Sequence, residues 1–345
     1  MSTQEIQIVL NFTLPPYEQR CFCMQIEDIY QTVEQDFSRV NELITSQLSS
    51  DVPLVEKIAQ YIVESGGKRM RPLLVLLTSR ALGFQGDDHI KLATIIEFLH
   101  TATLLHDDVV DTSDLRRGRS TANAKWGNAP SVLVGDFLYS RAFQMMVDMQ
   151  SMPIMSVLSN ATNVIAEGEV FQLMNCKNPD VSEAAYFEVI KNKTAMLFEA
   201  ASHSAAILSN ASDEAQTAMK QFGLHLGLAF QLVDDMLDYI GDAETMGKNV
   251  GDDLAEGKPT LPLIYAMKNS SENETALIRK AIRSGDISQL NEICETVKRC
   301  GALDYTQKAA ENAYQEACKC LEVLPDSPHK AALYGLAKLA VQRNK

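Results

Sequence analysis

The sequence predicts an all-α protein, because helix-forming residues dominate it and its apolar residues recur with helical spacing. Apolar residues make up 46% of the 345 residues and aromatic residues only 7%, which favours helices over strands. From Ile29, apolar side chains recur at steps of three and four residues through Val33, Phe37, Val40 and Ile44, and similar segments fill most of the chain. Strand-like alternation is nowhere sustained.

The helical segments are expected to form one domain over residues 24–345, because no linker rich in Ser, Gly or Pro divides them. Residues 1–23 alternate apolar and polar types and contain a Pro-Pro pair, so they are predicted to be an extension that is disordered or packed outside the core. Two longer segments, 113–130 and 241–259, are predicted to be loops, and each follows directly on an acidic cluster. Charged loops of that length in compact domains are more often functional than idle.

The net charge of −14 argues against a nucleic-acid partner, because a surface that binds phosphate backbones shows as a basic excess or stripe. The seven cysteines include no Cys-x-x-Cys pair, which fits the reducing cytoplasm, and no role is assigned to them. The sequence contains no run of about 20 apolar residues, so we expect no transmembrane segment. A cytoplasmic protein is expected, and loose association with a membrane stays open.

Two clusters share the pattern Asp-Asp-x-x-Asp and are made of Asp107, Asp108 and Asp111, and of Asp234, Asp235 and Asp238. Periodic apolar residues precede the first cluster, which puts it near the C-terminal end of a helix with Asp107 and Asp111 on one face. Such carboxylates repel one another and oppose the negative end of the helix dipole, so a cation should compensate them. Mg2+ is suited to this, because it takes oxygen ligands from carboxylates and from substrate phosphates. One cluster alone is more often a solvated helix end; two favour function.

Short basic islands accompany the aspartates. Two glycines, then Lys68 and Arg71, precede a proline that can open the next helix, and a helix start with such charges suits an anion. Arg116 and Arg117 follow the first cluster closely, where they would complete a charge-balanced cage around a diphosphate. An ordinary basic turn explains the first island equally well when it is judged alone.

From about Met24 to the C-terminus, these motifs resemble the trans-isoprenyl diphosphate synthases. The signatures present are Gly-Gly-Lys-x-x-Arg-Pro at 66–72, the two aspartate clusters with their nearby arginines and Gln231, and Gly-Lys-x-x-Gly-Asp-Asp-Leu-x-Glu-Gly-Lys-Pro-Thr at 247–260. The resemblance implies a single large helical bundle of the isoprenoid synthase type with a central substrate cavity. It also implies a Mg2+-dependent prenyltransferase that works as a homodimer.

The resemblance also implies roles for residues at matching positions. Those implied in binding isopentenyl diphosphate are Lys68, Arg71, His100 and Arg117. Those implied in binding the allylic diphosphate are Arg116, Lys193, Thr194, Gln231, Lys248 and Lys258. The implied Mg2+ ligands are Asp107, Asp111 and Asp234, supported by Asp108, Asp235 and Asp238. A catalytic role is implied for Lys193 together with Asp107, Asp108, Asp111, Asp234 and Asp235.

The implied reaction is a head-to-tail condensation. The allylic diphosphate leaves, the double bond of isopentenyl diphosphate attacks the carbocation, and a proton is lost. The protein would stabilise the leaving group, align the two substrates and keep water out. The resemblance implies an allylic primer such as farnesyl diphosphate and octaprenyl diphosphate as the product, for the side chain of ubiquinone. Heptaprenyl to nonaprenyl products stay alternatives.

Product length is predicted to depend on residues deeper along the helix of the first cluster. Thr103 and Ala102 lie on the face of the cluster, about 6 to 8 Å deeper at 1.5 Å per residue, and Leu99 comes next. Small residues at these positions would leave the pocket open for a long chain. Phe143 and Met146, on a later helix, are candidates for its floor, although plain core packing is the commoner explanation for either one alone.

Three other classes of protein share some of these features. A terpene cyclase uses one aspartate cluster and needs no isopentenyl diphosphate site, so the second cluster and the glycine-rich basic turn favour chain elongation. A di-iron bundle needs two Glu-x-x-His pairs, and the sequence offers only Glu97 with His100. A regulatory subunit would be expected to have lost charges from the clusters, which are intact.

Overall fold

The computed structural model describes residues 24–240 and 250–342. Its α-helices are α2 (Ile26–Gln31), α3 (Glu34–Gln47), α4 (Pro53–Glu64), α5 (Met70–Ala81), α6 (Asp88–Val110), α7 (Ala122–Trp126), α8 (Asn128–Asp148), α9 (Met152–Asn175), α10 (Glu183–Ile190), α11 (Met196–Leu208), α12 (Asp213–Ile240), α14 (Asp252–Ala255), α15 (Leu261–Asn269), α16 (Glu272–Ser284), α17 (Leu290–Arg299), α18 (Ala302–Cys320) and α19 (Pro328–Val341). The remaining elements are a π-helix η1 (Lys191–Ala195), a 3-10 helix η2 (Leu321–Val323) and the strands β1 (Leu115–Arg116) and β2 (Arg119–Ser120). The predicted all-α class is confirmed.

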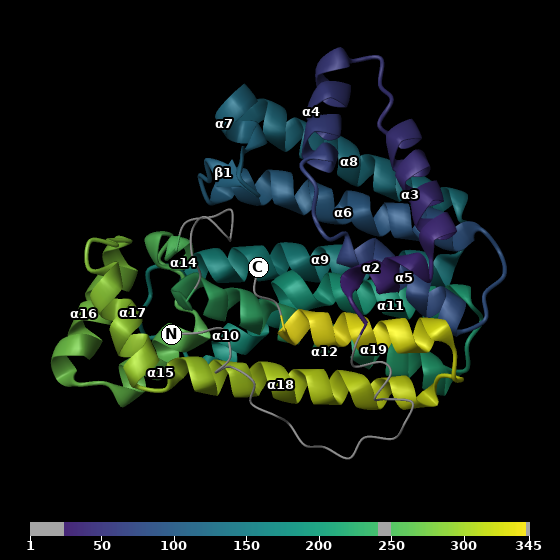
Figure 1. Ribbon diagram of the computed structural model, residues 1–345. Helices are drawn as coiled ribbons and strands as arrows, with labels where there is room; N and C mark the ends of the chain where they lie inside the picture. Colours follow the sequence, from purple (N-terminus) through teal and green to yellow (C-terminus); the bar gives the residue numbers. More distant parts are fainter. Residues whose placement is uncertain (1–23, 241–249, 343–345) are drawn as a thin grey trace.

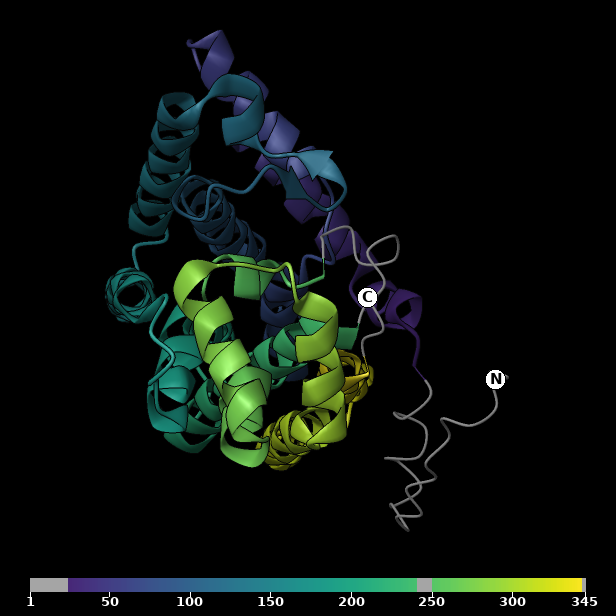
Figure 2. The same cartoon turned by 90° about the vertical axis from the view of Figure 1, so that its left-hand side faces the viewer.

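The long helices form a bundle with roughly aligned axes. In Figure 1, α6, α8, α9, α12 and α18 run across the molecule in layers, and in the turned view several long helices are seen nearly end on (Figure 2). Helix α6 packs against α8, and α12 packs against both α11 and α18. Helices α3 and α4 project beyond the bundle, while α14 to α17 gather at one end of it (Figure 1).

Helices α5 and α6 lie in the middle of the main hydrophobic core. The five consecutive residues Leu73 to Leu77 of α5 are all fully buried, so this helix has no solvent-facing side over that stretch. Most of α6 from His89 to Leu105 is buried as well. Because packing surrounds most of α6 from His89 to Leu105, the core holds in place the C-terminal end of the helix, where the first aspartate cluster lies.

The segments predicted as long loops contain short regular elements. In 113–130, β1 and β2 form an antiparallel hairpin, and Arg117 and Gly118 make its two-residue turn with φ of 54° and 72°. Positive φ at both central positions is the pattern of a type I′ turn, and glycine adopts it without strain at the second position. Thr121 then caps α7 by accepting a hydrogen bond from the Ala124 N–H. The segment 241–259 contains α14.

Two sequence-based predictions fall outside the described residues, namely the extension at 1–23 and the role of Lys248. Among the helices of the described part, none is long and apolar enough to cross a membrane.

Candidate active site

The first aspartate cluster lies where α6 ends. Asp107 is in the last turn of α6 and Asp111 is the residue that caps it. Both line a cavity of about 190 Å³. Asp108 is fully buried and does not line the cavity; its Oδ1 is 2.8 Å from Nε and 2.7 Å from Nη2 of Arg116. Asp108 therefore anchors the β1–β2 hairpin, and Arg116 is engaged by that carboxylate.

The second cluster lies near the end of α12. Asp234 and Asp235 line the same cavity as the first cluster. The buried carboxylate of Asp235 accepts a hydrogen bond from the Tyr186 hydroxyl at 2.5 Å and from Gln231 Nε2 at 2.7 Å. These two donors fix the orientation of Asp235, and the tyrosine is a partner that the sequence pattern did not reveal.

The π-helix η1 carries two further predicted residues to the cavity. Thr194 donates from Oγ1 to Gln231 Oε1 at 2.9 Å. Lys193 donates from Nζ to Glu169 Oε2 at 2.6 Å and to Gln172 Oε1 at 2.7 Å. Single π-turns within helices are often found at functional sites. Nothing in the local sequence of η1 marks it, so sequence reasoning missed both the π-turn and the two partners on α9.

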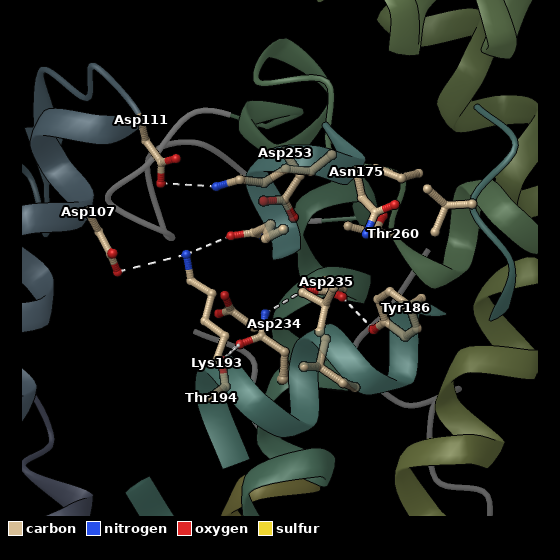
Figure 3. Close-up of a pocket in the computed structure, with 17 residues that line it drawn as sticks. Asp107, Asp111, Asn175, Tyr186, Lys193, Thr194, Asp234, Asp235, Asp253 and Thr260 are labelled. Carbon is tan, nitrogen blue, oxygen red and sulfur yellow. Dashed lines mark hydrogen bonds and ion pairs between the residues drawn. The ribbon is translucent and has the colours of Figure 1, made fainter. Parts of the chain in front are cut away.

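Figure 3 shows the two clusters on opposite walls of the cavity, with the side chain of Lys193 reaching between them. The Nζ atom of Lys193 is 4.0 Å from Asp107 Oδ2. The Nζ atom of Lys258 is 3.0 Å from Asp111 Oδ2. The structure therefore brings together both clusters and two of the predicted lysines in one place.

Asp253 adds a carboxylate to which sequence reasoning gave no role. It lines the cavity together with four aspartates of the clusters. Its backbone N–H donates to Asp238 Oδ2 at 3.2 Å, so the buried Asp238 holds the start of α14 against α12. The sequence feature that could have identified Asp253 is its place in the Gly-Asp-Asp motif at 251–253. In the structure, Gly251 of this motif has a φ of 83°.

Burial and mutual repulsion perturb the acids of the cavity. Burial raises the pKa of Asp107, and it raises the pKa of Asp235 to about 8. Burial and the nearby Asp107 carboxylate raise the pKa of Glu169 to about 7. Burial alone would lower the pKa of Lys258, but the carboxylates of Asp111 and Glu256 raise it above its usual value. The cavity thus gathers more carboxylates than its lysines neutralise.

The donor set of the cavity suits a hard divalent cation. Its wall offers the carboxylate oxygens of Asp107, Asp111, Asp234, Asp235 and Asp253. Within residues 24–240 and 250–342, however, no three His, Cys, Asp or Glu side chains form a group that could hold a metal ion. An ion that takes one or two carboxylates and completes its shell with water and phosphate oxygens fits such a wall.

Three of the four residues predicted to bind isopentenyl diphosphate form a second group. Arg71 Nη1 is 3.2 Å from His100 Nε2, and the Arg71 guanidinium lies 4.2 Å from the centre of the Phe198 ring. Burial lowers the pKa of Arg71 to about 10, and burial together with the charge of Arg71 lowers the pKa of His100 well below its usual range. Burial and the neighbouring Arg116 lower the pKa of Arg117. Arg71 and Arg117 supply the positive charge of this group, and the lowered pKa of His100 keeps its imidazole neutral.

The absence of a side chain at Gly67 allows the Arg117 guanidinium to lie against the backbone of the glycine-rich turn. A Cβ atom on Gly67 would lie 2.5 Å from Arg117 Nη1, and the φ of Gly67 is 127°. Lys68, the fourth predicted residue, is exposed on the same turn, and its carbonyl accepts a hydrogen bond from the Tyr30 hydroxyl. Among the described residues, the lining of the acidic cavity includes none of these four predicted residues.

The residues predicted to control product length lie in or against the main core. Leu99, Ala102 and Met146 are almost fully buried in it, and Phe143 packs against it. Thr103 donates from Oγ1 to the His100 carbonyl at 2.8 Å, which keeps its hydroxyl on the helix. Their effect on chain length stays a prediction.

A helical bundle in which two aspartate helices and lysines line one cavity, with an arginine group close by, defines an enzyme class that binds diphosphates. Residues 52–298 match the model of the polyprenyl synthetase family. The chain therefore belongs to that family, and the predicted trans-isoprenyl diphosphate synthase is confirmed as a prenyltransferase.

Relatives of known name agree with this placement. The chain is 51% identical over 323 residues to octaprenyl diphosphate synthase of Escherichia coli (strain K12), which covers 93% of this chain and 100% of that protein. It is 49% identical over 318 residues to an all-trans-nonaprenyl-diphosphate synthase (geranyl-diphosphate specific) of Rhodobacter capsulatus, with 92% and 98% covered. A polyprenyl synthase from Caulobacter crescentus CB15, crystallised with calcium and isoprenyl diphosphate, has a TM-score of 0.90 at 44% identity, with 93% and 98% covered.

Proposed function

We propose that this enzyme adds isopentenyl diphosphate repeatedly to an allylic diphosphate such as farnesyl diphosphate and releases octaprenyl diphosphate for quinone side chains. The observation that carries the proposal is the pairing of two aspartate helices on opposite walls of one cavity with a separate arginine group. A cavity rich in carboxylates suits a metal-bound diphosphate, and a group of arginines suits a second diphosphate that needs no metal.

The allylic diphosphate is assigned to the acidic cavity. Asp107, Asp111 and Asp234 would hold Mg2+, which supplies positive charge for the departing diphosphate. Lys193 and Lys258 stand beside these carboxylates and are placed to donate hydrogen bonds to diphosphate oxygens. The calcium in the Caulobacter crescentus relative supports a divalent cation in such a cavity.

Isopentenyl diphosphate is assigned to Lys68, Arg71, His100 and Arg117. Their role is to hold its diphosphate while the double bond lies against the allylic carbon. The allylic C–O bond breaks, the double bond attacks the cation, and loss of a proton restores a double bond. The departing diphosphate is the base we assign to that proton. The protein therefore contributes alignment and leaving-group stabilisation rather than a covalent intermediate.

Relatives of similar identity are named for products of different length: the chain is 51% identical to an octaprenyl synthase and 49% identical to a nonaprenyl synthase. We favour octaprenyl and keep the neighbouring lengths as alternatives. A terpene cyclase and a regulatory subunit are disfavoured, because both aspartate clusters and the arginine group are complete.

We also propose that the enzyme is a cytoplasmic homodimer with one catalytic domain over residues 24–345. Helices α8 and α9 expose large apolar side chains that favour a partner surface, namely Leu133, Val147, Met152, Val170, Leu173 and Met174. Light scattering on the purified protein would give the mass in solution. A Leu133→Asp variant should shift it toward the monomer.

The decisive assay incubates the purified protein with Mg2+, farnesyl diphosphate and labelled isopentenyl diphosphate and measures product length by chromatography. Octaprenyl diphosphate is expected. An Asp234→Asn variant should fold normally and lose most activity, because it removes one metal ligand. If well-folded wild-type protein made no elongated product, the proposed function would be wrong.

A further inference from the structure

Helix α9 supports the π-helix η1 at close range. A Cβ atom on Gly168 would lie 3.0 Å from the Asn192 Cβ and 3.1 Å from the Lys193 nitrogen. The missing side chain therefore lets α9 lie directly against the backbone of η1. The next residue along α9, Glu169, accepts a hydrogen bond from the Lys193 ammonium. The close approach at Gly168 therefore brings Glu169 within reach of Lys193.

The Lys193 ammonium is held by α9 and not by the first aspartate cluster. Its Nζ atom is 2.6 Å from Glu169 Oε2 and 2.7 Å from Gln172 Oε1, but 4.0 Å from Asp107 Oδ2. Gln172 lines the acidic cavity and Glu169 does not. Glu169 thus stands behind the lysine, where it touches the ammonium without taking part in the cavity wall.

A lysine side chain is flexible, so its ammonium needs partners to stay in one place. Without Glu169, the nearest strong anion for Lys193 is Asp107, and a closer Lys193–Asp107 ion pair would occupy a carboxylate that a divalent cation needs. The side chains of Lys193 and Glu169 are 18% and 27% exposed, so the contact between them is partly shielded from water. The distance of 2.6 Å between Lys193 Nζ and Glu169 Oε2 is that of a charge-assisted hydrogen bond, which fixes the ammonium more firmly than a bond between neutral groups.

We infer that Glu169 is a positioning residue of the reaction, which holds Lys193 at the diphosphate side of the cavity and away from Asp107. The inference rests on the proposed function, because it takes Lys193 to contact the allylic diphosphate. Glu169 acts only through Lys193. Its removal should therefore matter only while that lysine is present.

Steady-state kinetics of Glu169→Ala, Glu169→Gln, Lys193→Ala and the double variant test this. Loss of a hydrogen bond to a charged group corresponds to about a tenfold or larger effect, so E169A should lower kcat by at least about tenfold. E169A should also raise the Mg2+ concentration needed for half-maximal rate and leave KM for isopentenyl diphosphate unchanged. A glutamine side chain retains an acceptor oxygen, so E169Q should recover most of the activity. The double variant should equal K193A, whereas independent additive losses would overturn the inference.

Glu167→Ala is the matched control. Glu167 is on the same helix and carries the same charge, but it is exposed and accepts a hydrogen bond from Asn163. The E167A variant should behave as wild type. Equal losses of kcat in E167A and E169A would mean that the negative charge of α9 sets the rate, and not the hydrogen bond between Glu169 and Lys193.

A binding measurement separates failure of this inference from failure of the proposed function. Calorimetric titration with inorganic diphosphate in Mg2+ does not require turnover. We expect E169A to weaken binding severalfold in the wild-type background and to have no effect in the K193A background. The same weakening in both backgrounds would overturn the role of Glu169, even if the wild-type enzyme elongated its substrate. If wild-type protein bound diphosphate but made no product, while E169A still weakened binding only in the presence of Lys193, the proposed function would be wrong and the positioning of Lys193 by Glu169 would stand.

Discussion

Gly227 of α12 is the position where an added methyl group should disturb the active site most directly. A Cβ atom there would lie 2.5 Å from Cα and 2.8 Å from Cβ of Ala195, the last residue of η1. Carbon atoms pack at about 3.5 to 4.0 Å, so α12 and η1 would have to separate by about 1 Å. A backbone atom cannot rotate out of the way as the end of a side chain can.

This separation would break a hydrogen bond that links the same two elements. Thr194 Oγ1 and Gln231 Oε1 are 2.9 Å apart, and about 1 Å more puts them near 3.9 Å, beyond hydrogen-bonding distance. A misplacement of about 1 Å at a catalytic group can cost about a hundredfold in rate, and we expect Gly227→Ala to lower kcat/KM by that order. Overpacking costs about 1 to 3 kcal/mol, while alanine in a helix offsets about 1 kcal/mol, so the net loss of stability should be about 0 to 2 kcal/mol.

Gly335→Ala on α19 is the control for this prediction. Its Cβ atom would lie 3.0 Å from Ile29 Cδ1, the flexible end of a side chain in the main core. The control variant should retain wild-type activity. Both variants would be assayed for product formation with farnesyl and isopentenyl diphosphates, and their thermal midpoints compared by circular dichroism. If folded G227A kept wild-type kcat/KM, the contact between α12 and η1 would not set the geometry of the site.

Three further predictions concern pH, the arginine group and the product. The folded pKa values of Asp235 and Glu169 are raised to about 8 and about 7 from 3.8 and 4.5, so the folded state keeps protons that the unfolded state releases. The free energy of unfolding of Mg2+-free protein should therefore fall as the pH rises from about 4 to about 8. Denaturant titrations at several pH values would measure it, and a free energy of unfolding that rose with pH would contradict the prediction. Arg71→Lys should raise KM for isopentenyl diphosphate about tenfold and leave KM for the allylic diphosphate unchanged, because lysine lacks the planar guanidinium that lies over Phe198. Equal changes in the two KM values would count against the assignment of Arg71 to isopentenyl diphosphate. Met146→Ala should lengthen the product, and unchanged products for M146A and Phe143→Ala would remove both residues from the floor.

The sequence was sufficient for those features that depend on local pattern. The helical spacing of apolar residues predicted the bundle, and the apolar residues before the first aspartate cluster predicted that it lies at the end of a helix. Both wall positions on α6, Asp107 and Asp111, follow from a spacing of one helical turn. The same spacing shows why Asp108 points elsewhere, since neighbouring residues are about 100° apart around a helix. Only its partner, the partly exposed Arg116, needed the structure.

Partnerships between distant segments were beyond the sequence. Glu169 and Lys193 are separated by 24 residues, and Tyr186 and Asp235 by 49, so no periodicity connects them. The π-turn lies in close contact with α9 and α12, and contacts between distant segments leave no signal in the local sequence. Gly168 can be explained only once its contact with Asn192 and Lys193 is known.

The separation of the two charged groups has a chemical consequence under the proposed assignment. Both substrates carry a diphosphate, yet only the allylic C–O bond must break. The acidic cavity gathers carboxylates for a divalent cation, and its lysines are held by Glu169 and Asp111. Arg71, by contrast, lies over an aromatic ring beside His100, and in the described part of the chain it does not line the acidic cavity. Metal-assisted departure is thus confined to the allylic diphosphate, and the arginine group binds isopentenyl diphosphate without activating it as a leaving group. The fold achieves this by placing the carboxylates at the ends of α6 and α12 and the arginines on α5 and the hairpin.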